Sequence, residues 1–253
     1  MTRFSEWCDC KKLPLSKHKL EILTAEPLKR AHAVGLVAGS VPEHYASYSR
    51  IADLLRRLGR ESAAKYLAEK LPISLPIKSG DLGEILCSSF VSETTEFTLG
   101  IKRLRWKDHR NMSMRGEDLL GFSLGENGKS LKVLKAEVKS RASLKTSVVN
   151  EAREALSGFR ELPSAHAISF VADRLGETGN QSLQDALDDV QLKRGFKKSQ
   201  VTHMLFTFSG TNPSNMLSRN LEGYTGKVQQ HYVGIQVSDH KAFINEVFDA
   251  VEV

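Results

Sequence analysis

Residues 116–141 read Gly116-Glu-Asp-Leu-Leu-Gly-Phe-Ser-Leu-Gly-Glu-Asn-Gly-Lys-Ser-Leu-Lys-Val-Leu-Lys-Ala-Glu-Val-Lys-Ser-Arg141. Two apolar runs flank the four residues 125–128, where Asn-Gly readily takes positive φ. This pattern predicts two strands joined by a tight hairpin turn. The fold is organised around this pair of strands.

The second of these strands alternates apolar and charged residues. Successive side chains of a strand point to opposite faces. One face therefore carries Leu134, Ala136 and Val138, and the other carries Lys135, Glu137 and Lys139. Asp118, from the partner strand, comes near this charged face. Two carboxylates on adjacent strands with a lysine beside them suit a divalent metal and an activated water.

The elements around the hairpin predict an α/β domain. A helix begins at Ser79 and brings Asp81, Glu84 and Ser88 onto one face, because three or four residues make about one turn. A strand over 96–106, a helix over 147–160 and an apolar run of strand length at 165–172 complete the order αβββαβ for residues 79–172. Helices at 182–192 and 240–251 and strands at 201–208 and 231–237 form an additional α/β C-terminal segment, in which 214–230 is ambiguous.

The N-terminal part of the chain is predicted to be helical. The segment Ser40-Val-Pro-Glu43 has the pattern of a capping box. The helix after it is expected to end at Gly59, and a second helix runs from about 60 to 71. The first of these helices is expected to bury a stripe of apolar residues: Tyr48, Ile51, Ala52, Leu55 and Leu58. Pro72 and Pro76 then interrupt the pattern. We expect a helical N-terminal portion over 1–75, for partner binding or regulation, and a second domain over 76–253.

The composition sets only broad limits. The 253 residues carry a formal charge of +6, a mild indication of a polyanionic partner. Three cysteines argue against a disulfide framework, and no signal peptide or membrane-spanning stretch is evident, so we expect a cytoplasmic protein without membrane contact. Cys8 and Cys10 with His18 and His32 could suggest a metal, but they lack the spacing of a zinc site. Reduced thiols near a partly buried Trp7 are the simpler interpretation. No phosphate-cradling Gly-Lys-Ser loop is present, which argues against ATP hydrolysis.

The element order, with Asp118 on the second strand and Glu137-Val-Lys139 on the third, resembles the core of PD-(D/E)xK restriction-like nucleases. More narrowly, three segments together resemble the HamA family: Ser79-Gly-Asp-Leu-Gly-Glu84, Arg115-Gly-Glu-Asp-Leu-Leu-Gly-Phe122 and Lys135-Ala-Glu-Val-Lys-Ser-Arg141. HamA proteins are nuclease subunits of the bacterial Hachiman anti-phage system, and a related subunit occurs in the Abp abortive-infection pair. The motif resemblance covers roughly residues 79–172.

The roles of these residues follow from their chemistry and from the resemblance. Asp118 and Glu137 are candidate ligands of Mg²⁺, a hard ion that prefers oxygen ligands, and Mn²⁺ would be able to substitute. Lys139 would orient the attacking water or stabilise the charge of the transition state. Glu84 would add a ligand or hold a water. The resemblance adds the carbonyl of Val138 as a ligand, a superfamily 2 helicase of the HamB type as the restraining partner, and indiscriminate DNA degradation on release.

Two sets of cations are candidates for DNA binding. Arg103, Arg105 and Lys107 lie in a basic run around Trp106, which could stack on a nucleotide. A charged strand end with the tryptophan in the core is an equally good interpretation of that run. Arg141 and Lys145 directly follow the predicted site and are better placed to meet phosphates.

Simpler structural roles and other functions stay open at this stage. Glu137 and Lys139 could form an ion pair on an exposed strand, Asp118 could begin a turn, and Glu84 could be an exposed helix carboxylate. The alternatives to a metal-dependent DNA endonuclease are a catalytically silent nucleic-acid-binding scaffold and an RNA-directed nuclease.

Overall fold

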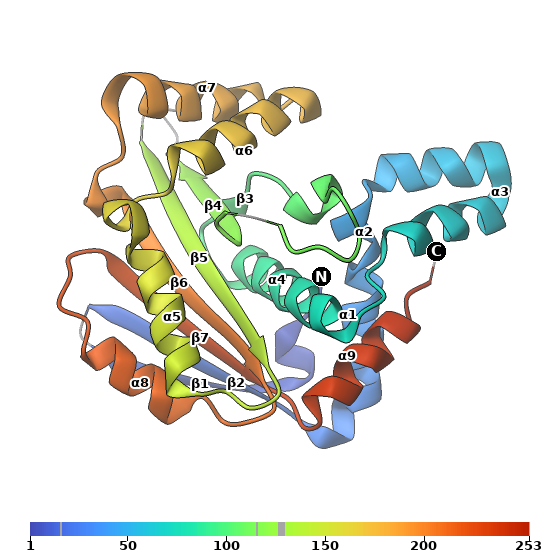
Figure 1. Cartoon of the computed structure of the whole chain (residues 1–253), viewed down its shortest axis with the longest axis horizontal. Coiled ribbons are helices and arrows are strands. Elements are labelled where there is room, and N and C mark those ends of the chain that lie inside the picture. The colour runs from blue at the N-terminus through green and yellow to red at the C-terminus, as the bar shows by residue number, and fades with distance from the viewer. Residues whose placement is uncertain (16, 115, 126–129, 253) are drawn as a thin grey trace.

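The computed structural model describes residues 1–15, 17–114, 116–125 and 130–252. Its centre is a seven-stranded sheet in the order β1-β2-β7-β6-β5-β4-β3 (Figure 1). The strands are β1 Cys8–Leu15, β2 His18–Ala25, β3 Thr98–Leu99, β4 Leu119–Leu124, β5 Leu131–Arg141, β6 Val201–Ser209 and β7 Gln229–Gln236. Strands β2, β7, β6 and β5 are mutually parallel, and the pairs β1–β2, β4–β5 and β3–β4 are antiparallel. The predicted α/β class is confirmed.

Helices cover both faces of this sheet (Figure 1). Their bounds are α1 Arg30–Ser40, α2 Pro42–Tyr45, α3 Tyr48–Lys70, α4 Leu75–Thr94, α5 Thr146–Ser157, α6 Ala165–Thr178, α7 Gln181–Asp189, α8 Ser214–Glu222 and α9 His240–Asp249. Helices α1, α4 and α9 bury one face together with residues of β5, β6 and β7. Helices α5 and α8 pack on the opposite face, and α6 and α7 continue that layer over β4 and the start of β5.

The hairpin that decides the fold has the predicted pairing. Leu119 lies opposite Ala136, and the antiparallel register continues to Leu124 opposite Leu131. Of the predicted turn, 126–128 lie outside the described residues. Lys135 points away from α4 and is buried, with its ammonium donating to the carbonyl oxygens of Leu156, Gly158 and Leu162.

Helix α4 packs tightly against β5, and Gly83 allows this approach. A Cβ on Gly83 would lie 3.0 Å from Cγ1 of Val138, closer than side chains normally approach. The buried stripe of α4 is as predicted, with Leu82, Ile85, Leu86 and Phe90 inside. The helix starts at Leu75 rather than Ser79, because Pro76 occupies its first turn, where proline is favoured. This close contact brings the next residue, Glu84, towards the start of β4.

The prediction of an all-helical N-terminal portion is wrong for residues 8–25. They form the β1–β2 hairpin, and β2 pairs in parallel with β7, so the sheet crosses the predicted division near residue 75. The predicted capping box is also wrong, since the Ser40 hydroxyl donates to the carbonyl of Val37 and it is Ser47 that caps α3.

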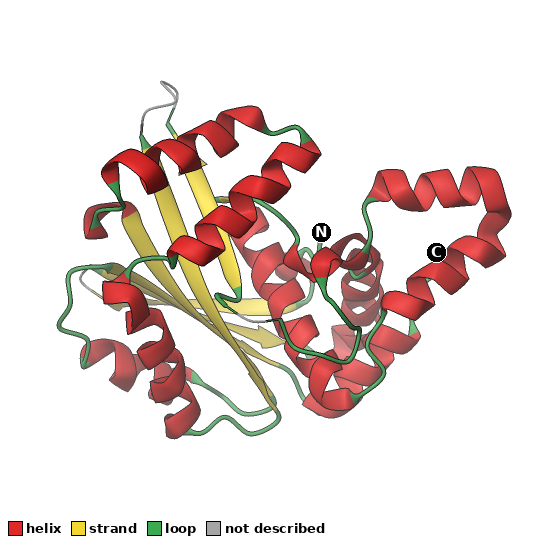
Figure 2. Ribbon diagram, turned by 45° about the horizontal axis from the view of Figure 1, so that its top comes forward, coloured by secondary structure: helices red, strands yellow, loops and turns green. Residues whose placement is uncertain are grey.

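Helix α3 projects from the body of the molecule (Figures 1 and 2). Gly59 breaks it as predicted, with φ of 81°. The predicted buried stripe is wrong for Tyr48, Ala52, Leu55 and Leu58, which are exposed, and Ile51 is only partly buried. The buried residues of this helix are instead Leu54, Ala63 and Leu67.

Two predicted strands are wrong in whole or in part. Of the range 96–106, only Thr98–Leu99 is a strand, and Arg103–Trp106 is a 3-10 helix. The run at 165–172 is the beginning of α6, which Ser164 caps and which buries Ile168, Val171, Ala172 and Leu175 at helical spacing. The final strand of the αβββαβ order is therefore β6, which pairs in parallel with β5.

The other C-terminal predictions are confirmed. Strands β6 and β7 and helices α7 and α9 lie where the pattern placed them, and the ambiguous range 214–230 contains α8. Within the described ranges, none of the helices combines the length and apolarity needed to cross a membrane.

Candidate metal site

Asp118 lies directly before β4, across from Glu137 on β5. The register of Leu119 opposite Ala136 places these two acidic residues side by side. One carboxylate oxygen of Asp118, Oδ2, accepts a hydrogen bond of 2.8 Å from the backbone N–H of Val138. The hairpin therefore fixes Asp118 at the end of the strand pair.

Lys139 and Glu137 point to the same face of β5, as two residues at i and i+2 of a strand must. Nζ of Lys139 lies 2.7 Å from Oε1 of Glu137, and the two side chains are 20% and 16% exposed. An ion pair this poorly solvated interacts more strongly than one at the surface. The pair lies beside Asp118, because Glu137 is directly across from Asp118 in the register of the two strands.

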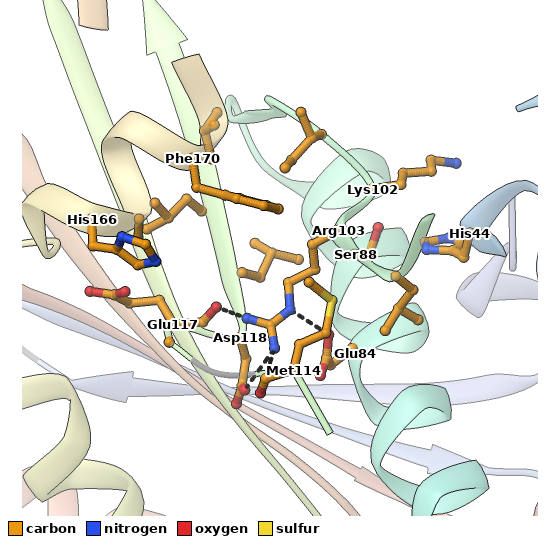
Figure 3. Close-up of a pocket in the computed structure, with 17 residues that line it drawn as sticks. His44, Glu84, Ser88, Lys102, Arg103, Met114, Glu117, Asp118, His166 and Phe170 are labelled. Carbon is orange, nitrogen blue, oxygen red and sulfur yellow. Dashed lines mark hydrogen bonds and ion pairs between the residues drawn. The ribbon is translucent and has the colours of Figure 1, made fainter. Parts of the chain in front are cut away.

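Glu84 reaches the site from helix α4, where its carboxylate faces Arg103. The guanidinium of Arg103 lies between the carboxylates of Glu84 and Asp118 (Figure 3). Its Nε is 3.1 Å from Oε2 of Glu84, and its Nη2 is 4.0 Å from Oδ1 of Asp118. The guanidinium also donates to the carbonyl oxygens of Met114 and Glu117. Two carboxylates from different elements thus face one cation.

Burial changes the protonation of both carboxyl groups. Burial raises the pKa of Glu84 to about 8; Arg103 lowers it, and the nearby charge of Asp118 raises it. Burial likewise raises the pKa of Asp118 to about 6, and the charge of Glu137 adds to the increase. Desolvation disfavours the charged form of an acid, and a neighbouring negative charge does the same. The charge of Arg103 therefore offsets only part of the cost of burying Glu84 and Asp118.

The oxygen donors of the site suit a hard divalent cation in their chemistry but not yet in their arrangement. Oε2 of Glu84 is buried and makes no hydrogen bond within the described part of the chain, so the contact with Nε of Arg103 is an ion pair without hydrogen-bond geometry. Oxygen ligands and uncompensated negative charge are what Mg²⁺ requires. Among the described residues, no three His, Cys, Asp or Glu side chains are gathered closely enough to hold a metal ion. In this structure, the positive charge between Glu84 and Asp118 is the guanidinium of Arg103.

The side chains of Arg103, Arg105 and Lys107, predicted to bind DNA, are engaged with protein groups. Arg105 donates to the carbonyl oxygen of Glu43 through Nε and Nη2. The ammonium of Lys107 contacts both carboxylate oxygens of Asp81, at 2.9 and 2.7 Å, and both side chains are only 5% exposed. DNA binding by these three residues stays a prediction. To bind DNA, their side chains would have to give up these contacts within the protein.

Arg141 and Lys145, the other predicted DNA-binding residues, follow the Glu137–Lys139 pair in the chain. Both are exposed; Arg141 ends β5, and Lys145 directly precedes α5. Their side chains are available to solvent beside the helix N-terminus, a location that favours phosphate groups. Cys8 is buried in the core and Cys10 is exposed, as expected of reduced thiols.

Two other residues near the site are not among those predicted from the sequence. His44, at the end of α2, and Phe170, in α6, line a cavity that also reaches Glu84 and Asp118 (Figure 3). Phe170 falls in the segment interpreted as a strand. The helical spacing of Ile168, Val171 and Leu175 around it is the signal that could have placed it on a helix. His44 carried no signal, because only the packing of α2 against the 3-10 helix at 103–106 brings it here.

Comparison with known proteins identifies the family of the chain. A sequence model of the family described as HamA matches residues 1–251. The chain is 26% identical over 250 residues to the Hachiman protein HamA of Bacillus cereus. This alignment covers 96% of this chain and 88% of that protein. Because the family match extends over nearly the whole chain, the protein belongs to the HamA family of the Hachiman anti-phage defence system.

Proposed function

We propose that this protein is a metal-dependent DNA endonuclease, the effector subunit of a defence complex in which a helicase restrains and then releases it. The observation that carries this proposal is the pair of carboxylates, Glu84 and Asp118, that face one cation beside the Glu137–Lys139 pair. Metal-dependent phosphodiester hydrolysis uses clustered acidic ligands for the metal, with a positive group nearby to stabilise the developing charge.

Asp118, Glu137 and Glu84 would hold the metal, with the carbonyl of Val138 as a further ligand. Bound Mg²⁺ supplies charge neutralisation at the phosphate and a water of lowered pKa. Lys139 places a positive charge beside the carboxylates, where it can orient the attacking water and stabilise the negative charge that develops on the phosphate. Burial of these groups strengthens each of these interactions, because they are poorly screened by solvent.

Arg141 and Lys145 would position the DNA backbone. They are exposed cations at the end of β5 and the start of α5, adjacent in the chain to Lys139. Phosphate contacts of this type fix the orientation of a strand and contribute affinity without reading its sequence. Cleavage without sequence preference is consistent with such contacts.

The helicase partner is proposed from membership of the HamA family. The relative is named as a protein of the Hachiman system, and a defence nuclease must be restrained until infection. The projecting helix α3, with Tyr48 and Leu58 exposed, offers a partner an accessible surface on this chain (Figure 2).

Plasmid degradation by the purified complex of this chain with its helicase tests the proposal. We expect cleavage with ATP and Mg²⁺, none with EDTA, and loss of at least about 100-fold in rate for Glu137→Ala and for Lys139→Ala. Lys132→Ala is the matched control, because Lys132 lies on the same strand but pairs with Glu96, away from the site.

The two other functions give different results in the same experiment. A silent scaffold would bind DNA tightly without metal-dependent cleavage by any variant. An RNA-directed nuclease would cleave a matched RNA and leave the plasmid intact. Equal plasmid cleavage by wild type and both site variants would place the activity outside these residues.

A further inference from the structure

A cavity of about 140 Å³ lies beside the candidate metal site, between the start of β4, helix α6 and the 3-10 helix at 103–106. Its walls are largely apolar and include Ile101, Leu120, Phe170 and Val171. Figure 3 shows Phe170 on one side of the Arg103 guanidinium, with Ser88 and His44 on the side towards α4 and α2. Glu84 and Asp118 belong to the same lining, so whatever enters the cavity adjoins the candidate metal ligands.

Two polar groups in the lining have no partner among the residues that the structure describes. His44 and Ser88 are 4% and 5% exposed, and in the described part of the chain neither side chain makes a hydrogen bond or ion pair. Burial lowers the pKa of His44, so its imidazole is neutral and presents one donor and one acceptor. Neither side chain is among the fully buried atoms that lack a partner, so their polar atoms are open to the cavity and can bond whatever fills it. An apolar cavity with an available imidazole and hydroxyl therefore suits a ligand that is largely apolar and has a polar edge.

The size of the cavity selects among such ligands. An apolar cavity of about 150 Å³ is known to accommodate benzene. A space of about 140 Å³ thus holds one six-membered ring with small substituents. Pyrimidine bases are rings of this size with hydrogen-bonding edges, whereas purines are larger by a fused five-membered ring. Aromatic side chains such as Phe170 provide a surface on which bases stack.

The burial of the candidate ligands restricts the form of the substrate. The side chains of Glu84 and Asp118 are only 16% and 21% exposed. A base in a duplex is stacked and paired, and it can enter a cavity only when its nucleotide is unpaired or extruded from the helix. We propose, on the basis of the proposed nuclease function, that this cavity binds a pyrimidine base of an unpaired DNA strand and so directs the enzyme to single-stranded DNA.

Binding of labelled oligonucleotides in EDTA tests this proposal without cleavage. The full-length chain is titrated, at one salt concentration, into single strands of thymidine, of deoxyadenosine and of abasic sites, and fluorescence anisotropy gives each Kd. We expect the thymidine strand to bind about tenfold more tightly than the abasic strand and more tightly than the deoxyadenosine strand. Phe170→Ala should abolish this difference and leave the affinity for the abasic strand unchanged.

Two further variants keep the test decisive. Ala167→Leu adds bulk to the lining of the cavity and should also abolish the preference, which matters if Phe170→Ala fails to fold. Phe159→Ala removes a 68% exposed phenylalanine that is not part of the lining and should change nothing. Equal binding of all three strands by wild type would overturn the proposal, as would a thymidine preference that survives both cavity variants.

Failure of this inference and failure of the proposed function give distinct results. Plasmid cleavage by the complex with equal affinity for all three strands would refute the base cavity alone. A cavity-dependent thymidine preference without metal-dependent cleavage would refute the nuclease alone. A uridine RNA strand that binds more tightly than the thymidine strand would overturn the assignment to DNA.

Discussion

Nε of Arg103 lies 3.1 Å from Oε2 of Glu84, and neither atom makes a hydrogen bond within the described part of the chain. The same guanidinium is 4.0 Å from Asp118. Arg103 therefore occupies the position in which a metal ion would be held by these two carboxylates. In the proposed metal site, this cation of the chain would compete with a divalent ion for the two carboxylates.

Replacing Arg103 by methionine should strengthen divalent-metal binding. Unit charges about 4 Å apart interact by about 4 kcal/mol at an effective dielectric constant of 20, and even a third of that corresponds to about a tenfold change in affinity. We expect Arg103→Met to bind Mn²⁺ at least about tenfold more tightly than wild type at pH 8, as measured by electron paramagnetic resonance of free Mn²⁺. Arg105→Met, on the same 3-10 helix, is the control. Weaker Mn²⁺ binding by Arg103→Met would show that the guanidinium supports the site rather than competing for it.

Lys107 should prove essential for stability. Its ammonium and the Asp81 carboxylate form a buried ion pair, and the hydroxyl of Tyr45 donates to the same carboxylate at 2.6 Å. Removing one partner leaves an uncompensated buried charge, which costs about 3–5 kcal/mol. Lys107→Met should lose about this much free energy of unfolding in urea, and the double variant Asp81→Leu/Lys107→Met should recover most of it. Unchanged stability together with weaker DNA binding would favour instead the role predicted from the sequence.

The parts of the fold that the sequence predicts well are those with a strong local pattern. The pairing of β4 with β5, the stripe of α4 and the helix α5 each follow from residues that are neighbours in the chain. Strand β1 has no such pattern, since Cys8 is its buried member while Asp9 to Lys12 are exposed. Its partner β2 is held in place by β7, roughly 200 residues away in sequence. Long-range pairing of this kind decides strand formation more than local preference does.

The same distinction applies to the candidate site. Asp118, Glu137 and Lys139 come together through the local register of one hairpin, so their proximity could be predicted. The position of Arg103 between Glu84 and Asp118 could not, because a basic run looks the same whether its cations face solvent or buried carboxylates. Only the packing of α4 and the 3-10 helix against the start of β4 distinguishes the two.

Arg141 and Lys145 should contribute to DNA affinity through phosphate contacts. Each neutralised phosphate releases counterions, so each lost contact reduces the slope of log K against log salt by about one unit. Arg141→Ala/Lys145→Ala should therefore bind a labelled duplex more weakly at 50 mM salt, with a slope about two units shallower, as measured by anisotropy in EDTA. Lys132→Ala, at the other end of β5, controls for loss of charge. An unchanged slope in the double variant would exclude these residues from the DNA interface.

His203 should make the protein more sensitive to acid. It is fully buried between β5 and β7; Nδ1 accepts from Arg153 and Nε2 donates to the carbonyl of Glu161. Burial, followed by the charge of Arg153, lowers the pKa of His203 to about 3. Because the folded-state pKa lies below the unfolded value of about 6.5, the stability that His203 contributes is complete above pH 6.5 and is lost as the pH falls towards 3. Between pH 7 and pH 5 this loss is about 2 kcal/mol.

Urea unfolding at several pH values should show a free-energy profile that is flatter by this amount for His203→Gln than for wild type. Exposed His109→Gln is the control for loss of a histidine. Parallel profiles for wild type and His203→Gln would mean that the imidazole is protonated in the folded state, which the contact with the Arg153 guanidinium disfavours.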